Sequence, residues 1–231
     1  PALCRNVTAK CGICATRCAY GAITAEQGQA AHVVPAKCHG CGTCVAECPA
    51  GATTQYHFTD RQIMDQIAAI LRENPEDKIL AFTCNWCSYA GADLAGISRY
   101  DYPTTVRGIR VMCSGRISVK FILEAFRLGA GMVLLSGCRL TETGSDCHYI
   151  SGNVWAEKRA RRIEGMLERI GIDKRRFRLE WVSAAEGDKW ADIIRAMTLN
   201  GYKAADIIKE RGPIRPGFDA DMIAVVGDPL S

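Results

Sequence analysis

Thirteen cysteines are the residues of this sequence whose type and spacing could do chemistry. They fall in close pairs and triplets, and none follows position 147. An odd number in this arrangement is a poor disulfide framework, whereas close groups of thiols are typical of metal sites and redox motifs. The pattern therefore predicts a reducing compartment, the cytoplasm, and metal or redox chemistry. The thirteen are Cys4, Cys11, Cys14, Cys18, Cys38, Cys41, Cys44, Cys48, Cys84, Cys87, Cys113, Cys138 and Cys147.

The densest group lies in residues 38–49, which read Cys-His-Gly-Cys-Gly-Thr-Cys-Val-Ala-Glu-Cys-Pro. This is the full C-x2-C-x2-C-x3-C-P run of bacterial proteins that hold two iron–sulfur clusters. The first three cysteines suit one corner of a cubane cluster, and the fourth, Cys48, serves the other cluster. A zinc site is the alternative, but zinc ribbons usually place two C-x2-C pairs either side of a long loop.

A second copy of this motif precedes the first by 30 residues, so that Cys11, Cys14 and Cys18 correspond to Cys41, Cys44 and Cys48. The repeat places the remaining cysteine at Thr8, but it is displaced to Cys4. We expect the extra residues to loop out, because a short insertion costs little closure entropy. The alternative is that Cys4 is free and the first cluster has three protein ligands.

The repeat thus predicts two [4Fe–4S] clusters, each with three ligands from one half of the module and one from the other. The first predicted set is Cys4, Cys11, Cys14 and Cys48, and the second is Cys38, Cys41, Cys44 and Cys18.

Five later cysteines follow candidate strands. Cys84 and Cys87 form a C-x2-C pair after the first strand, Cys113 and Cys138 end the next two, and Cys147 lies nine residues further on. Because ligands gather at the carboxyl ends of parallel strands, all five should meet at one sheet edge. Four thiolates are enough for a [2Fe–2S] cluster. A thioredoxin-type dithiol and a zinc site are the alternatives, and one of the five could be an inert core residue.

The elements that must position these cysteines are of two kinds. Beyond residue 78, short apolar runs alternate with helical patterns, which predicts a parallel sheet with right-handed crossovers. The fold class is therefore an α+β two-cluster module followed by a small α/β domain with an open parallel sheet. The predicted strands are residues 79–83, 109–112, 132–135 and 177–182, and the predicted helices are residues 92–98, 116–128, 154–170 and 188–197.

Local signals divide the chain. Thr59 and Gln62 have the form of a capping box, and Pro75 stops the helix that follows. We expect a cluster-binding module at 1–58, a helix and linker at 59–77, the α/β domain at 78–198 and a tail at 199–231. Residues 214–230 resemble the C-terminal strand of amidohydrolases, but the chain is too short for that barrel. A start at Pro1, three residues before a predicted ligand, leads us to expect more protein upstream.

Composition adds little beyond this. Apolar residues make up 48% and charged residues 23%, as in ordinary globular proteins. No apolar run approaches the roughly 18 residues of a membrane helix, and a net charge of +4 gives no reason to expect nucleic-acid binding. No catalytic triad, carboxylate pair or phosphate loop stands out. The chain alone should therefore make and break no substrate bond.

A basic stretch and four histidines complete the candidates. We interpret the stretch as the solvated side of the helix at 154–170, with docking of an acidic partner as the alternative. We interpret the histidines as structural, although His39 and His148 could donate hydrogen bonds beside cysteine ligands. The basic residues are Lys158, Arg159, Arg161, Arg162, Arg169, Lys174, Arg175, Arg176 and Arg178. The face of the helix that we expect to be buried carries Trp155, Ile163, Met166, Leu167 and Ile170. The other two histidines are His32 and His57.

At these motifs the sequence resembles two known families. Residues 1–75, including Tyr-His-Phe-Thr-Asp at 56–60, resemble the C-terminal ferredoxin segment of the A subunit of heterodisulfide reductase. Residues 78–196 resemble the delta subunit of the methyl-viologen-reducing hydrogenase, with matches at 84–93, 110–116, 146–152 and 179–184. The two are known to occur fused in one polypeptide.

The resemblance implies an oxidoreductase component of flavin-based electron bifurcation in anaerobic, methanogenic archaea. It implies that electrons pass from a hydrogenase or formate dehydrogenase through a [2Fe–2S] cluster toward the flavin of the reductase's A subunit, with its B and C subunits and ferredoxin as further partners. FAD is expected in a partner or upstream region, because no G-x-G-x-x-G follows a strand here. The family usually has a tighter turn where residues 139–146 stand, so the implied ligands are Cys84, Cys87, Cys113 and Cys147, with Cys138 as the alternative.

Overall fold

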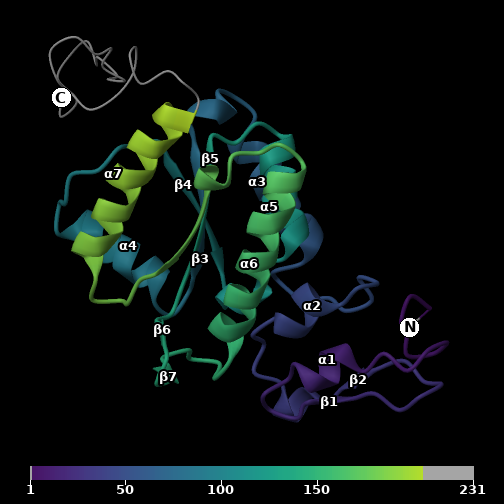
Figure 1. Cartoon of the computed structure of the whole chain (residues 1–231). Coiled ribbons are helices and arrows are strands. Elements are labelled where there is room, and N and C mark those ends of the chain that lie inside the picture. The colour runs from purple at the N-terminus through teal and green to yellow at the C-terminus, as the bar shows by residue number, and fades with distance from the viewer. Residues whose placement is uncertain (1, 205–231) are drawn as a thin grey trace, which may run out of the picture.

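The computed structural model of the chain describes residues 2–204. Most of the predicted tail therefore lies outside the described residues, and the amidohydrolase-like segment 214–230 lies outside them entirely. A small cysteine-rich module is followed by a layered α/β domain (Figure 1). In the described part of the chain, no helix is both long and apolar enough to cross a bilayer.

Four parallel strands form the sheet of the α/β domain. They lie in the order β4-β3-β5-β8, which confirms the predicted parallel sheet. The two central strands are mostly apolar runs that are buried on both faces, as expected where helices cover both sides. The bounds are β3 (Ile79–Cys84), β4 (Val106–Val111), β5 (Met132–Gly137) and β8 (Phe177–Trp181), within three residues of each prediction.

Helices cover both faces of this sheet (Figure 1). One core lies between the sheet and the first set of helices, around Phe82 and Phe121, and the other lies around Ala81 and Trp190. Gly129 and Gly171 take positive φ just after two of the helices, as is typical of C-terminal caps. The first set is α3 (Asp60–Ile70), α5 (Val119–Arg127) and α6 (Gly152–Arg169), and the second is α4 (Ser88–Ile97) and α7 (Gly187–Ala204).

Helix α3 begins at the predicted capping box. Thr59 Oγ1 accepts a hydrogen bond from Gln62 N at 3.2 Å, and Gln62 Oε1 accepts one from Thr59 N at 2.9 Å. The helix buries Ile63 and Ile67 in the first core, beside α5. The segment between the two cysteine-rich regions is therefore part of the packed α/β layer.

The basic stretch on α6 is only partly solvated. The side chain of Arg159 is 2% exposed, so its assignment to a solvated face was wrong. Ile163 and Leu167 are buried as expected, whereas Met166 and Ile170 are exposed. Arg159 is buried because the cysteine-rich module packs over the beginning of α6, a contact that helical periodicity does not reveal.

The cysteine-rich module is built from short elements. Two short helices begin after Gly12 and Gly42, whose positive φ angles of 58° and 78° reflect the sequence repeat. Its buried apolar core is small, with Ala22, Ile23 and Val45. Domains with so little core usually need a metal, a disulfide or a neighbouring domain for stability. The elements are α1 (Ile13–Thr16), β1 (Ile23–Thr24), β2 (His32–Val33) and α2 (Thr43–Glu47).

The connections contain further short elements. A hairpin of β6 (Leu140–Thr141) and β7 (Gly144–Ser145) occupies the turn before Cys147. Single 3-10 turns are η1 (Pro35–Lys37), η2 (Pro75–Asp77), η3 (Ser114–Arg116) and η4 (Lys174–Arg176). The turn η3 matters most for the site, because it follows Cys113 and lies between α2 and α6.

Candidate metal centres

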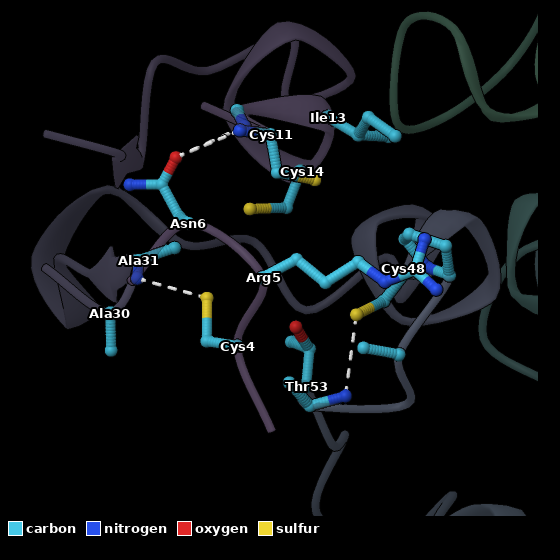
Figure 2. A pocket seen from close by; sticks show the side chains of 14 residues that line it. Cys4, Arg5, Asn6, Cys11, Ile13, Cys14, Ala30, Ala31, Cys48 and Thr53 are labelled. Atoms are coloured by element: carbon cyan, nitrogen blue, oxygen red, sulfur yellow. Dashed lines mark hydrogen bonds between the residues drawn. The ribbon is translucent and has the colours of Figure 1, made fainter. Parts of the chain in front are cut away.

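The first predicted ligand set lines a single cavity of about 220 Å³ (Figure 2). Cys4, Cys11, Cys14 and Cys48 reach it from three separate stretches of chain, and its other walls include Arg5 and Pro49. The structure therefore brings the displaced Cys4 to the place that the repeat leaves open. Four thiols and no carboxylate around one cavity form a donor set that suits an iron–sulfur cluster.

Asn6 holds the inserted loop that carries Cys4. Its Nδ2 donates to Glu26 O at 2.5 Å and to Gln29 O at 3.0 Å, while its Oδ1 accepts from Cys11 N at 3.2 Å and from Gly12 N at 3.3 Å. The side chain is 2% exposed. Sequence reasoning missed Asn6, because one asparagine in a short loop carries no periodic signal.

Backbone amides point at the sulfurs of this module. Ala52 N donates to Cys48 Sγ at 3.3 Å, and the repeat-related Ala22 N donates to Cys18 Sγ at 3.4 Å. Burial acts to raise the pKa of Cys48, but hydrogen bonds from Ala50, Ala52 and Thr53 outweigh it and lower the pKa. Such amides stabilise thiolate sulfur, the form that binds metal.

In the second predicted set Cys38 is exposed, and Cys18, Cys41 and Cys44 are half-buried. Burial raises the pKa of Cys44 to about 12, and the charges of Cys41, Cys38, Cys14 and Cys18 contribute to the rise. Charges of both Cys14 and Cys18 from the first half act on Cys44, so the assignment of Cys18 to this set stays a prediction. Burial also raises the pKa of Cys41, and a bound cation would favour the thiolate form of both residues.

The five later cysteines converge at the carboxyl ends of three adjacent strands. Cys84 ends β3, Cys113 follows β4, and Cys138 follows β5. The Cys84 and Cys138 sulfurs are 3.7 Å apart, those of Cys84 and Cys87 are 3.9 Å apart, and those of Cys113 and Cys147 are 3.8 Å apart. All five are buried, so the edge predicted from the strand order is where the thiols gather.

Cys138 is fully part of this group. It forms a disulfide with Cys87, and with Cys84 and Cys87 it makes a trio whose sulfurs lie within 4.8 Å of one another. The longer turn at 139–146 therefore does not displace it. The disulfide joins Cys87 to Cys138 and not to Cys84, and both partners are buried, which does not favour a thioredoxin-type dithiol within the C-x2-C pair.

The pKa values of Cys84, Cys113 and Cys147 shift in different directions. A hydrogen bond from Cys113 lowers the pKa of Cys147 to about 6, and the contact with Cys113 likewise lowers the pKa of Cys84. The same contacts raise the pKa of Cys113. The contact with Cys113 thus favours the thiolate of Cys147, which is the ligating form.

Gly152 leaves room for two of these sulfurs. A Cβ at this position would lie 2.1 Å from the Cys113 sulfur and 3.3 Å from the Cys147 sulfur. Next to it, Asn153 Nδ2 donates to Cys138 O at 3.1 Å and to Arg139 O at 2.9 Å. The start of α6 thus encloses the site and fixes the strand end that carries Cys138.

Aromatic rings stack beside cysteines in both regions. His148 stacks on Trp86 with ring centroids 3.8 Å apart, and His39 stacks on Tyr20 at 3.9 Å. The two histidines that we singled out beside cysteines are thus held in ring stacks.

The second and third sites share a wall. Cys113, Cys147 and Tyr149 form one buried cluster, against which Tyr20, Cys41 and Met112 pack. Cys41 belongs to the second predicted set, whereas Cys113 and Cys147 belong to the third. No sequence pattern predicts this contact, because it depends on how the two domains pack.

Two buried arginines fix that packing. Arg159 donates from Nε to Ile117 O at 2.9 Å, from Nη2 to Gly115 O, and from Nη1 to the Glu47 carboxylate. Glu47 directly precedes the predicted ligand Cys48. Arg116 donates to Phe58 O at 2.9 Å and to Asp60 at 2.6 Å. The loop after Cys113 is thereby clamped against the cysteine-rich module.

Comparison with known proteins agrees with these two regions. Residues 79–200 match the family model described as methyl-viologen-reducing hydrogenase, delta subunit, and residues 31–54 match the 4Fe-4S binding domain. The D iron-sulfur subunit of the vhc F420-non-reducing hydrogenase of Methanococcus voltae is 49% identical over 120 residues, which cover 52% of this chain and 81% of the relative.

A second kind of relative spans both regions. The A subunit of the ferredoxin:CoB-CoM heterodisulfide reductase of Methanosarcina mazei is 44% identical over 214 residues, covering 80% of this chain and 26% of the relative. The corresponding reductase protein of Methanosarcina acetivorans is 42% identical over 218 residues, covering 81% of this chain and 26% of the relative. The chain spans about a quarter of the length of these relatives. The chain belongs to the methyl-viologen-reducing hydrogenase delta subunit family, with a 4Fe-4S binding domain in front of the family domain.

Proposed function

We propose that this chain is the electron-relay segment of a heterodisulfide-reductase-type complex and holds three iron–sulfur clusters. Two are [4Fe–4S] clusters, in the first and second cysteine sets. The third is a [2Fe–2S] cluster at the carboxyl edge of the sheet, and four of the five cysteines there are its ligands. Such clusters supply one-electron transfer at potentials that the surrounding protein sets.

The shared wall carries this proposal. Cys41 packs against the buried cluster that contains Cys113 and Cys147, so a proposed ligand of the second set lies beside two of the third. An electron that reaches the sheet edge therefore has a short path through packed side chains to the cysteine-rich module. Two independent metal sites would not need such contact.

The protein groups around this path exclude water and fix distances. Tyr149 is 5% exposed and lies among the sulfurs of the wall, while the stack of Trp86 on His148 lies beside Cys87 and Cys147. Gly152 allows the backbone of α6 to approach Cys113 closely. These residues position ligands without themselves changing oxidation state.

We infer the partners from the relatives. The matched proteins are named as subunits of heterodisulfide reductases and of F420-non-reducing hydrogenases. We therefore propose a hydrogenase or formate dehydrogenase as one redox partner and the flavin in the core of a reductase A subunit as the other. The B and C subunits and ferredoxin complete the same electron-bifurcating complex. The thiol-rich sites suit a reducing cytoplasm.

Among the sheet-edge cysteines we propose Cys84, Cys87, Cys113 and Cys147, with Cys138 as the alternative. Cys87 and Cys138 both lie within reach of Cys84, and reduction of the disulfide that joins them would free either sulfur to bind the cluster. Serine substitution at each of the five separates these possibilities. Four substitutions should abolish the [2Fe–2S] signal, and the fifth should leave it.

Iron content and electron paramagnetic resonance test the proposal. Anaerobically purified chain should contain about ten irons and no zinc, since two [4Fe–4S] clusters and one [2Fe–2S] cluster sum to that number. After dithionite reduction, a [2Fe–2S] signal should appear beside the [4Fe–4S] signals, and Cys84→Ser should remove it alone. About eight irons without a [2Fe–2S] signal would contradict the relay and leave a ferredoxin module.

A further inference from the structure

Arg116 is buried with one donor group unused. Its side chain has no exposed surface. Nε and Nη2 donate to Phe58 O at 3.2 and 2.9 Å, Nη2 also donates to Asp60 at 2.6 Å, and the guanidinium packs over the Phe121 ring at 5.1 Å. Nη1 is buried and has no hydrogen-bond partner among the described residues. An unsatisfied buried donor is costly, so this atom is expected to have an acceptor in the working protein.

The Arg116 side chain passes close to the backbone of the second cysteine set. A Cβ at Gly42 would lie 2.5 Å from Arg116 Cδ, and Gly42 stands between Cys41 and Cys44. Burial lowers the pKa of Arg116, while the charges of Asp60 and Cys44 act to raise it. The unused Nη1 donor therefore belongs to a guanidinium that interacts electrostatically with Cys44 of the second set. Cluster sulfur is a hydrogen-bond acceptor, and such bonds help to set cluster potentials.

We propose that Arg116 tunes the second [4Fe–4S] cluster: a buried cation carried by the α/β domain, whose side chain passes Gly42 of the neighbouring module and whose Nη1–H has no partner among the described residues, raises that cluster's reduction potential. This inference rests on the proposed function, because it requires a cluster in the second set. Reduction adds one negative charge to the cluster, and a nearby buried cation stabilises that state more than the oxidised state.

The first set has no equivalent among the residues that line its cavity. Arg5 is one of them but is exposed to solvent, where water and salt screen its charge. The two halves of the repeat thus hold similar thiols beside different cations. Packing of the α/β domain makes the second cluster, the one at the shared wall, easier to reduce than it would be alone.

Redox titration of the full chain, followed by electron paramagnetic resonance, tests this proposal. Arg116→Gln should lower one [4Fe–4S] midpoint potential and leave the other [4Fe–4S] and the [2Fe–2S] potentials unchanged. We expect about a tenfold fall in the reduced-to-oxidised ratio at a fixed potential, which for one electron is about 59 mV. Arg116→Lys keeps the charge and should retain most of the wild-type potential.

Arg176→Gln is the matched control. Arg176 also donates to two backbone carbonyls, Gly131 O at 2.8 Å and Ala130 O at 2.7 Å, and packs over Phe126 at 5.3 Å. Arg176→Gln therefore removes backbone hydrogen bonds and a ring contact comparable to those that Arg116→Gln removes. Because these contacts lie away from the cysteine sets, none of the three potentials should move.

Asp60→Asn gives a second test if Arg116 variants fold poorly. Asp60 pairs with both Arg116 and Lys120, so its removal leaves the guanidinium charge uncompensated. The potential that falls in Arg116→Gln should rise in Asp60→Asn. Full iron content with no selective shift in either variant would overturn the role of Arg116, whereas absence of the second cluster from the wild type would overturn the proposed function itself.

Discussion

The two halves of the cysteine-rich module share a sequence repeat but differ in what surrounds them. The first site is a cavity whose lining residues all come from positions 4–53. The second site lies against the α/β domain, where Cys41 packs with Cys113 and Cys147 and where Arg116 crosses Gly42. Duplication thus produced two similar thiol sets, and packing of a second domain made them unequal. Variants that perturb either the cysteine-rich module or the α/β domain can test this difference between the two sites.

Iron removal should produce the largest effect and confine it to one region. The module buries little apolar surface of its own, whereas the α/β domain has two cores. Chelation after oxidation should therefore unfold residues 2–58 and leave the sheet intact. Limited proteolysis with mass spectrometry should find all early cuts before residue 59. Early cuts inside β3 or β5 would show that the α/β fold also depends on iron.

Arg159→Met should break the clamp between the regions. The Arg159–Glu47 pair is buried, with side chains 2% and 6% exposed, so removing Arg159 leaves the buried Glu47 carboxylate with only the more distant Arg17 Nε at 3.6 Å and costs about 3 kcal/mol. Arg161→Met on the same helix is the control, because the Arg161–Glu157 pair is exposed and contributes about 0.5 kcal/mol. Anaerobic urea unfolding measures both. Equal costs for the two variants would mean that the clamp does not hold the domains.

Two buried asparagines allow a test of single sites. Asn6 ties the loop of the first site, and Asn153 ties the strand end of the third, each through several hydrogen bonds. Alanine at either position leaves buried backbone groups unpaired and should cost about 2 kcal/mol. Asn6→Ala should weaken the [4Fe–4S] signal of the first site, and Asn153→Ala the [2Fe–2S] signal. Loss of the same signal in both variants would contradict separate sites.

The smallest effect concerns the junction of the two regions. Thr59→Ala removes the capping box of α3 and should cost about 1 kcal/mol. Ser118 is the control: it stands at the N-cap of α5 but makes no capping hydrogen bond, so Ser118→Ala should cost little. Thermal unfolding compares the two variants, and a lower melting temperature for Ser118→Ala than for Thr59→Ala would contradict the role of the capping box.

The sequence predicted the elements well because their signals are local. The four strands followed from short apolar runs alternating with helices, and α3 followed from Thr59 and Gln62. The edge where Cys84, Cys113 and Cys138 meet followed from a general property of parallel sheets. In each case neighbouring residues, or the rule for one fold class, were sufficient.

The contacts between domains could not be predicted in this way. Arg159 stands in a basic run and has the local pattern of a solvated residue, yet the neighbouring module buries it. Arg116 follows Cys113 with nothing in its surroundings to indicate that it crosses Gly42. Both positions depend on the packing of two domains whose sequences carry no periodic signal for each other.

Magnetic coupling between clusters tests whether the second and third sites adjoin, as a relay requires. In the fully reduced chain, the [2Fe–2S] signal should be broadened and fast-relaxing because a paramagnetic [4Fe–4S] cluster lies beside it. Cys44→Ser, which removes the second cluster, should restore a sharp signal, whereas Cys11→Ser, at the first site, should leave it broad. A sharp, slowly relaxing [2Fe–2S] signal in the fully loaded, fully reduced wild type would contradict the relay.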